Sequence, residues 1–196
     1  MASFEEAYKI TKGNEGGYVF DPRDSGGETY KGIARKYHPL WPGWKLVDNH
    51  KKLLGGKIAR GYVIPDTALN NLVTAFYKTN FWKLLDGDNI KNQQIANLIF
   101  DFGVNGNTTT VITFVEKIIQ GLGFSIRVDG KIDPVTLKYL NEQNPHEVYS
   151  RLKARIKEYY EGLATKNPAK YGWALESWRN RLARFPDVLE DIKKKV

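Results

Sequence analysis

The sequence predicts a mainly α protein, and three observations support this prediction. Apolar residues recur along most of the chain at the three-to-four-residue spacing of amphipathic helices. Several of these stretches begin at an aspartate or asparagine that can cap a helix, and several end at glycine. No stretch alternates apolar and polar residues for long enough to indicate a ladder of strands.

The first predicted helix runs from about Phe4 to near Asn14 or Glu15. Gly16-Gly17 follows and is expected to supply the left-handed residue that closes a helix. Residues 17–33 are rich in Gly, Pro, Asp and Ser, so we expect a loop or a small irregular hairpin there.

The remaining helices follow from apolar periodicity and from start signals such as Asp133-Pro134 and Asn144-Pro145. The stretch 92–103 is apolar on more than one face, which predicts the central buried helix of the fold. The predicted helical ranges are 32–37, 45–60, 65–82, 92–103, 108–120, 133–140, 146–165 and 168–185.

Composition narrows the classes of function. The 196 residues, 41% of them hydrophobic, suffice for one substantial domain or two small lobes that share a cleft. The chain has no cysteine, which excludes disulfides and a thiol nucleophile. Its three histidines lie far apart, so a zinc hydrolase is disfavoured. We expect no metal and no cofactor.

Glu15 is the candidate catalytic acid. The negative end of the preceding helix and a wall formed by Tyr18 would disfavour its ionised form and raise its pKa. A protonated carboxyl can donate a proton to a glycosidic oxygen. A glutamate beside a helix-closing glycine is also a common surface arrangement.

A second carboxyl on the following loop, Asp21 or Asp24, could oppose Glu15 across a bound sugar. Glycosidases use two carboxyls, about 6.5–9.5 Å apart when inverting and about 5–5.5 Å apart when retaining. Aspartates in such loops also bind backbone amides. We favour that simpler role for Asp21, and both roles stay open for Asp24.

One block of residues resembles a known family. Its members are Glu15-Gly16-Gly17-Tyr18, Asp21-Pro22, Asp24, Gly26-Gly27, Thr29 and Gly32-Ile33. The block resembles the signature of the N-acetylmuramidases of glycoside hydrolase family 108. Its Glu, Asp, Thr order is also similar to that of phage-type lysozymes.

Later motifs extend this resemblance over roughly residues 4–185. A turn at Asp129-Gly130 resembles that of peptidoglycan-binding-type domains, although Asp133 stands where glycine is usual. Weaker motifs of the same family and of its companion C-terminal domain are Phe81-Trp82, Phe100-Asp101-Phe102 and Trp178-Arg179-Asn180-Arg181.

The resemblance implies a lysozyme-like, two-lobed helical fold. Residues 1–92 would form the catalytic lobe, and residues 93–196 a C-terminal lobe that resembles a peptidoglycan-binding domain, packed with the first across a cleft. It implies hydrolysis of the β-1,4 bond between N-acetylmuramic acid and N-acetylglucosamine, with Glu15 as proton donor. Asp24 would activate water and Thr29 would position it. A transglycosylase route with Glu15 alone is the less favoured outcome.

The candidate substrate-binding residues combine aromatic and hydrogen-bonding side chains. Asp101 and Asn105 lie one helical turn apart and share a face. They could bind sugar N-acetyl or hydroxyl groups, or they could serve as buried hydrogen-bond anchors. We expect an aromatic residue among Tyr30, Trp41 and Trp44 to contact glycan. The full set is Tyr18, Tyr30, Trp41, Asp101 and Asn105.

A net charge of +8 favours polyanionic partners. No nucleic-acid-binding motif is present, so we expect glycan strands of peptidoglycan, with attraction to the anionic wall or membrane, and a monomer. The first residues do not resemble a signal peptide. We therefore expect an endolysin or prophage-derived lysozyme, made in the cytoplasm and acting on the wall after release or non-signal export. The alternative is a non-catalytic wall-binding or secretion-accessory protein.

Overall fold

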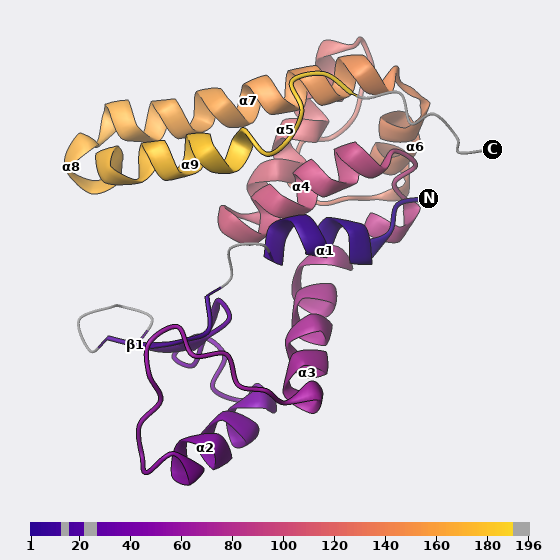
Figure 1. The fold of residues 1–196 in the computed structure, drawn as a ribbon. Helices are drawn as coiled ribbons and strands as arrows, with labels where there is room; N and C mark the ends of the chain where they lie inside the picture. The colour runs from indigo at the N-terminus through magenta and orange to yellow at the C-terminus, as the bar shows by residue number, and fades with distance from the viewer. Residues whose placement is uncertain (13–15, 22–26, 190–196) are drawn as a thin grey trace. The chain divides into compact units, whose positions relative to one another are not determined.

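The computed structural model describes residues 1–12, 16–21 and 27–189, and it is mainly helical, as predicted (Figure 1). The chain divides into two compact units, Thr11–Asn80 and a second that combines Met1–Ile10 with Phe81–Val196. The predicted lobes, residues 1–92 and 93–196, were consecutive in sequence. The units are instead interleaved, because the first ten residues belong with the C-terminal part of the chain.

Three short strands of the described chain form an antiparallel sheet in the Thr11–Asn80 unit. They are β1 (Tyr18–Phe20), β2 (Glu28–Tyr30) and β3 (Ile33–Ala34). Strands β2 and β3 are joined by Lys31 and Gly32, which both have positive φ, 44° and 78°. Left-handed pairs of this kind make the tight turns of hairpins. The helix predicted at residues 32–37 is therefore wrong.

Gly17 has a different role from the predicted one. Neither Gly16 nor Gly17 adopts a left-handed conformation, and the first helix, α1 (Phe4–Lys12), is described only up to Lys12. A Cβ atom on Gly17 would instead clash with the carbonyl oxygen of Tyr62. This close approach allows the Tyr18 amide to donate to Tyr62 O and the Gly61 amide to donate to Tyr18 O, both at 2.8 Å.

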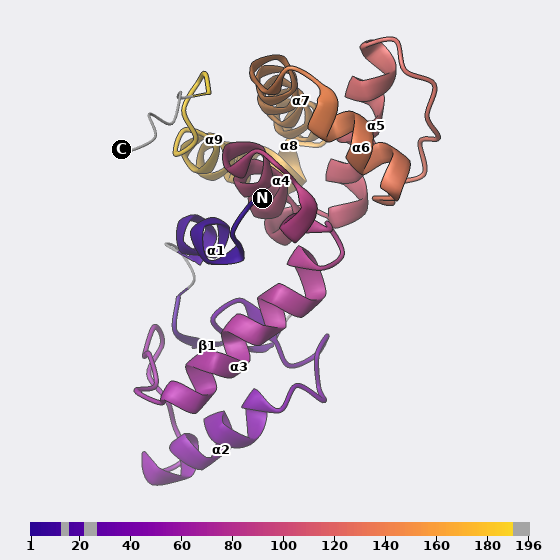
Figure 2. The same cartoon turned by 90° about the vertical axis from the view of Figure 1, so that its right-hand side faces the viewer.

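Two helices complete this unit. Helices α2 (Gly43–Leu53) and α3 (Thr67–Tyr77) lie side by side (Figures 1 and 2). The start of α3 is as predicted, because the Asp66 carboxylate accepts a hydrogen bond from the Leu69 amide at 2.9 Å. A π-helical turn, η1 (Lys78–Trp82), follows α3.

The second unit is built around α4 (Gln93–Asn105), in which every residue from Ile95 to Gly103 is buried. This confirms the predicted central helix. Helices α5 (Thr108–Gly121) and α7 (Pro145–Lys166) pack against it (Figure 2).

Phe4 of α1 adds an aromatic contact to this core, with its ring 5.8 Å from the rings of both Trp82 and Phe100.

The predicted start signals of the second unit are confirmed. Asp133 accepts from the Thr136 amide at 2.7 Å and opens α6 (Pro134–Glu142), and Asn144 caps α7 in the same way. The stretch predicted to be helical at residues 168–185 is helical up to Leu182, as α8 (Pro168–Tyr171), a 3-10 turn (Gly172–Ala174) and α9 (Leu175–Leu182). A further 3-10 turn, η2, spans Gly87–Asn89. Among the described helices, none has the length and apolar composition that a bilayer crossing requires.

Candidate active-site region

The predicted acid and base, Glu15 and Asp24, lie outside the residues that the structure describes. Pro22 and Gly26 of the motif also lie outside the described residues, whereas Gly16-Gly17-Tyr18, Thr29 and Gly32-Ile33 are described. Tyr18 on β1 pairs with Tyr30 on β2, and Val19 pairs with Thr29. The sheet therefore brings the chain that follows Glu15 alongside the strand that carries Thr29.

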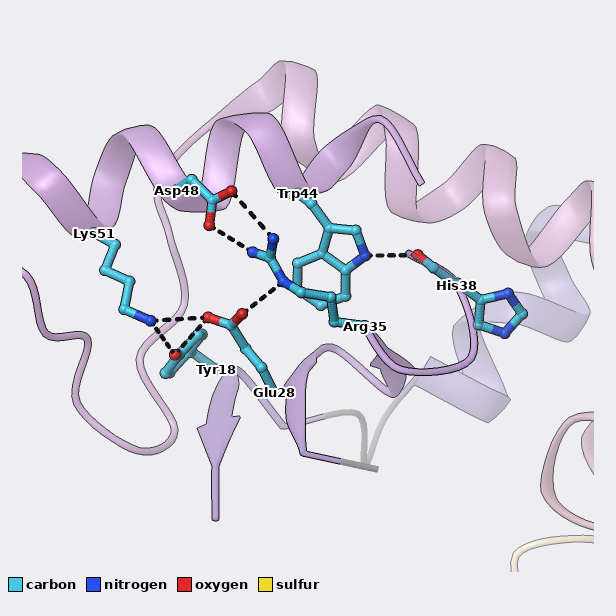
Figure 3. A network of polar contacts seen from close by, with 7 residues as sticks. All are labelled: Tyr18, Glu28, Arg35, His38, Trp44, Asp48 and Lys51. Atoms are coloured by element: carbon cyan, nitrogen blue, oxygen red, sulfur yellow. Dashed lines mark hydrogen bonds and ion pairs between the residues drawn. The ribbon is translucent and has the colours of Figure 1, made fainter. Parts of the chain in front are cut away.

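Glu28, at the start of β2, is the centre of a polar network (Figure 3). Its Oε1 accepts a hydrogen bond from the Tyr18 hydroxyl at 2.7 Å and another from Lys51 Nζ at 3.1 Å. Its Oε2 lies 2.6 Å from Arg35 Nε in an ion pair. Two hydrogen bonds and one further ion pair thus hold this carboxylate in place and tie β2 to β1, to the residue after β3 and to α2.

Arg35 connects the sheet to α2. Its guanidinium donates to both Asp48 carboxylate oxygens, at 3.1 and 2.5 Å, and lies 4.3 Å from the ring of Trp44. Burial alone would lower the pKa of Arg35, but its hydrogen bonds and charge interactions with Asp48 and Glu28 raise it overall. Arg35 directly follows β3, so its guanidinium links the end of β3 to strand β2 and to helix α2 (Figure 3).

Tyr18 and Lys51 complete the network. Burial and the hydrogen bond to Glu28 raise the pKa of Tyr18 above its usual value, so the phenol remains a donor at neutral pH. The hydrogen bond with Tyr18, together with Glu28, raises the pKa of Lys51. The network as described contains two carboxylates and two cations, so its formal charges balance.

The other predicted residues of this unit differ in exposure. Thr29 is half-buried in β2. Tyr30 is completely buried, and its hydroxyl accepts from the Ile64 amide at 3.2 Å, so its ring offers no surface to a sugar in this conformation. Trp41 is 8% exposed and donates from Nε1 to Leu72 O at 3.4 Å.

Trp41 nevertheless borders a cavity of about 370 Å³ within this unit. Aromatic and apolar side chains make up most of its lining, which fits stacking against a sugar face. The lining residues are Tyr37, His38, Pro39, Leu40, Trp41, Phe76 and Asn80. Glycan contact by Trp41 stays a prediction.

Lys31 is a buried cation beside Thr29 that sequence reasoning missed. Its Nζ donates to Asn70 Oδ1 at 2.7 Å, and its carbonyl accepts from the Tyr77 hydroxyl at 2.8 Å. Burial, followed by the charge of Lys12, lowers the pKa of Lys31. Nothing in the local sequence marks this lysine as buried, because its burial depends on α3.

Asp101 and Asn105 belong to the second unit and have unequal surroundings. Asp101 is buried, and its carboxylate accepts two hydrogen bonds from Arg181, both at 2.7 Å. Asn105 is exposed and donates to Asp101 O. Of the two roles considered for Asp101, the geometry favours the buried anchor. It joins α4 to α9 within one unit.

Two further motifs have structural explanations in the same unit. Trp178 lies on α9, the helix that also carries Arg181. It stacks on Tyr160 of α7 with ring centres 4.9 Å apart. At the Asp129-Gly130 turn, the buried Glu116 carboxylate accepts from both backbone amides, at 3.3 and 2.9 Å. A peptidoglycan-binding role for this part of the chain stays a prediction.

Comparisons with known proteins test the family resemblance of the block from Glu15 to Ile33. Residues 8–106 match the model of the family described as Glycosyl hydrolase 108, a span that includes Glu15 and the start of the predicted C-terminal lobe. The chain belongs to glycosyl hydrolase family 108. The resemblance of the Glu-Gly-Gly-Tyr block is thereby confirmed at the family level, and the chain is a glycoside hydrolase by class.

One solved structure extends the likeness beyond the family match. The Brucella abortus SagA structure covers 93% of this chain and 94% of its own, with a TM-score of 0.57 and 20% identity. At that identity the likeness shows a common fold. No curated protein matches the chain. Within the described residues, no three His, Asp or Glu side chains gather as metal ligands.

Proposed function

We propose that this family 108 member is an N-acetylmuramidase that hydrolyses the β-1,4 bond between N-acetylmuramic acid and N-acetylglucosamine in peptidoglycan. One observation carries the proposal: the family match over residues 8–106 contains the complete block from Glu15 to Ile33. The strand pairing supports it further, because it joins the segment that follows Glu15 to the strand that carries Thr29.

In the proposed mechanism, Glu15 protonates the glycosidic oxygen and the C–O bond breaks with oxocarbenium character. Asp24 removes a proton from a water molecule, which attacks the anomeric carbon from the opposite face. Thr29 holds that water by a hydrogen bond. The product is a free reducing end with inverted configuration, and the two carboxyls finish with exchanged protonation states.

Replacing Glu15 by Gln tests the acid. We expect the lysis rate of purified peptidoglycan, followed by turbidity, to fall about 10²- to 10⁴-fold, the usual contribution of a general acid. Glu142→Gln is the matched control, since Glu142 is exposed and should leave the rate unchanged. Wild-type activity in Glu15→Gln would refute the assignment, provided that circular dichroism shows both variants folded.

Mass analysis of the released muropeptides tests the reaction. Hydrolysis leaves reducing-end muramic acid, whereas transglycosylation leaves an anhydro sugar. We expect reducing ends, and we expect Asp24→Asn to lower the rate as strongly as Glu15→Gln. Anhydro ends with an active Asp24→Asn variant would instead mean that Glu15 acts alone. Binding to peptidoglycan without release of muropeptides would indicate the non-catalytic alternative.

We also propose that the enzyme acts as a monomer on the cell wall after release or non-signal export. Its net charge of +8 would attract it to the anionic wall. Sedimentation of the purified protein tests the oligomeric state. Fractionation of producing cells tests where the enzyme accumulates.

A further inference from the structure

A second cavity of the Thr11–Asn80 unit combines cations with aromatic walls. It has a volume of about 390 Å³ and lies beside the Glu28 network, with which it shares Tyr18 and Lys51. Its lining residues are Tyr18, Phe20, Lys51, Gly56, Lys57, Ile58 and Arg60. Nothing in the proposed bond cleavage requires this cavity.

We propose that this pocket, which we call the stem pocket, binds a carboxylate of the peptide stem that peptidoglycan carries on its muramic acid. The inference rests on the proposed function, because it takes peptidoglycan as the substrate. It adds a second recognition element, for the peptide rather than for the glycan.

The charges of the stem pocket are the first argument. Lys51 is already compensated by Glu28, at 3.1 Å. Lys57 and Arg60 are exposed, and neither forms an ion pair with a carboxylate anywhere in the described chain. The lining therefore includes two exposed positive charges that no carboxylate of the described residues pairs with, which favours an anionic ligand.

The apolar surfaces of the pocket are the second argument. Of its lining residues, Tyr18 and Ile58 are buried, whereas Phe20 is 58% exposed. An exposed aromatic ring next to cations fits a ligand that carries a short alkyl segment beside its carboxylate. The stem peptide contains such a segment, because an alanine lies next to a γ-linked glutamate whose α-carboxylate is free.

The rigidity of the pocket is the third argument. Lys51 lies 5.7 Å from the centres of both the Tyr18 and Phe20 rings and is hydrogen-bonded to the Tyr18 hydroxyl. The β1 strand is in turn held by two hydrogen bonds to the loop at Gly61 and Tyr62. Part of the lining is thus ordered before a ligand arrives, which lowers the cost of binding.

Direct binding is the first test. The probe is the tripeptide L-alanyl-γ-D-glutamyl-L-lysine with free carboxylates, titrated into the full-length protein by calorimetry, with its carboxamide analogue as comparison. We expect the carboxylate form to bind at least fivefold more tightly. The double variant Lys57→Gln/Arg60→Gln should weaken its binding about tenfold.

Lys45→Gln is the matched control, because Lys45 is exposed on α2 of the same unit and does not line the pocket. It should change the affinity less than twofold. Equal binding of the carboxamide, undiminished binding by the double variant, or tighter binding of glycerol phosphate would each overturn the proposal.

Cleavage is the second test, and it separates this proposal from the proposed function. The substrates are intact peptidoglycan and glycan strands stripped of stems by an amidase. The measured quantity is the cleavage rate on intact peptidoglycan divided by the rate on stripped strands. This ratio should fall about fivefold in the double variant and stay within twofold of the wild-type value in Lys45→Gln. An unchanged ratio would contradict the stem pocket. If the wild type cleaves neither substrate yet binds the tripeptide, the proposed function fails and the stem pocket stands.

Discussion

The two units of this chain use charge in opposite ways. In the Thr11–Asn80 unit, Glu28, Arg35, Asp48 and Lys51 share several contacts on a partly exposed surface. In the other unit, Asp101 and Arg181 form one bidentate pair whose side chains are only 6% and 13% exposed. The first arrangement spreads the charge over several partly exposed groups, whereas the second includes a bidentate ion pair that is almost fully buried.

The cores of the units differ as well. Strands of two or three residues bury little apolar surface and are not stable on their own, so the small sheet depends on the Glu28–Arg35 network and on the Gly17–Tyr62 approach. The second unit has long helices around α4 and a continuous apolar core. Mutations should therefore act through polar contacts and close backbone approach in one unit, and through burial in the other.

The largest effect on stability is expected at the buried pair. Arg181→Ala removes the guanidinium that donates two hydrogen bonds to the buried Asp101 carboxylate, and breaking such a buried ion pair costs about 3–5 kcal/mol. Arg179→Ala is the control, because the Arg179–Glu161 pair is exposed and should be worth about 0–1 kcal/mol. Urea denaturation measures both. Equal losses of unfolding free energy would show that the buried pair stabilises the protein no more than the exposed pair does.

The next effect is expected at Gly17. The new methyl group of Gly17→Ala would meet the Tyr62 carbonyl oxygen, and relieving that clash should cost about 1–3 kcal/mol. Gly16→Ala is the matched control, because its new methyl group would have no neighbour within 4 Å. If both substitutions leave the denaturation midpoint unchanged, the close approach of the two segments is not needed for stability.

A smaller effect is expected at Arg35. Arg35→Met retains much of the packing on Trp44 but leaves Glu28 and Asp48 with fewer donors. We expect a loss of about 1–2 kcal/mol, because Lys51 and Tyr18 still bind Glu28. Arg155→Met removes an exposed pair with Glu158 and is the control. A loss of unfolding free energy as large as that of Arg181→Ala would mean that Lys51 and Tyr18 do not compensate for the missing guanidinium.

The smallest effect concerns acid pH and applies to both units. Hydrogen bonds from the Leu69 and Thr136 backbone amides lower the pKa of Asp66 and Asp133 respectively. A carboxyl with a lowered folded-state pKa contributes stability above its unfolded value, near pH 4, and loses it as the pH falls through the folded value. Asp66→Asn and Asp133→Asn keep a capping oxygen, so each should reduce the loss of stability below about pH 4. Acid titration of the unfolding midpoint at constant ionic strength measures this, and a loss identical to the wild type would exclude the contribution.

Sequence reasoning predicted most of the helices and a small hairpin within residues 17–33, but it placed a helix where β3 lies, for physical reasons. Helix starts at Asp66, Asp133 and Asn144 depend on local capping, which a sequence displays directly. The three strands are too short for alternation to appear, and the β2–β3 turn uses Lys31 at positive φ, a residue type that does not signal such a turn. The positions of the three strands therefore depend on tertiary pairing and not on a local sequence pattern.

The candidate site was predicted only in part. The family could be inferred from the Glu15 block because its residues are contiguous, and the family match confirms it. Glu28 and Arg35 were missed, since their contact depends on the β2–β3 pairing, where the sequence predicted a helix. Asp101 was recognised as a polar residue with two alternative roles. Its partner, Arg181, lies too far along the chain for spacing to suggest the pair.

The interleaving of the two units has a consequence for synthesis on the ribosome. Phe4 packs on Trp82 and Phe100, which are translated long after it. At ~5–20 residues per second, the roughly 100 residues up to Phe100 take about 5–20 s to make. The whole Thr11–Asn80 segment is synthesised during that delay. The first residues wait for their partners, so the nascent chain exposes an aromatic side chain that a ribosome-bound chaperone could protect.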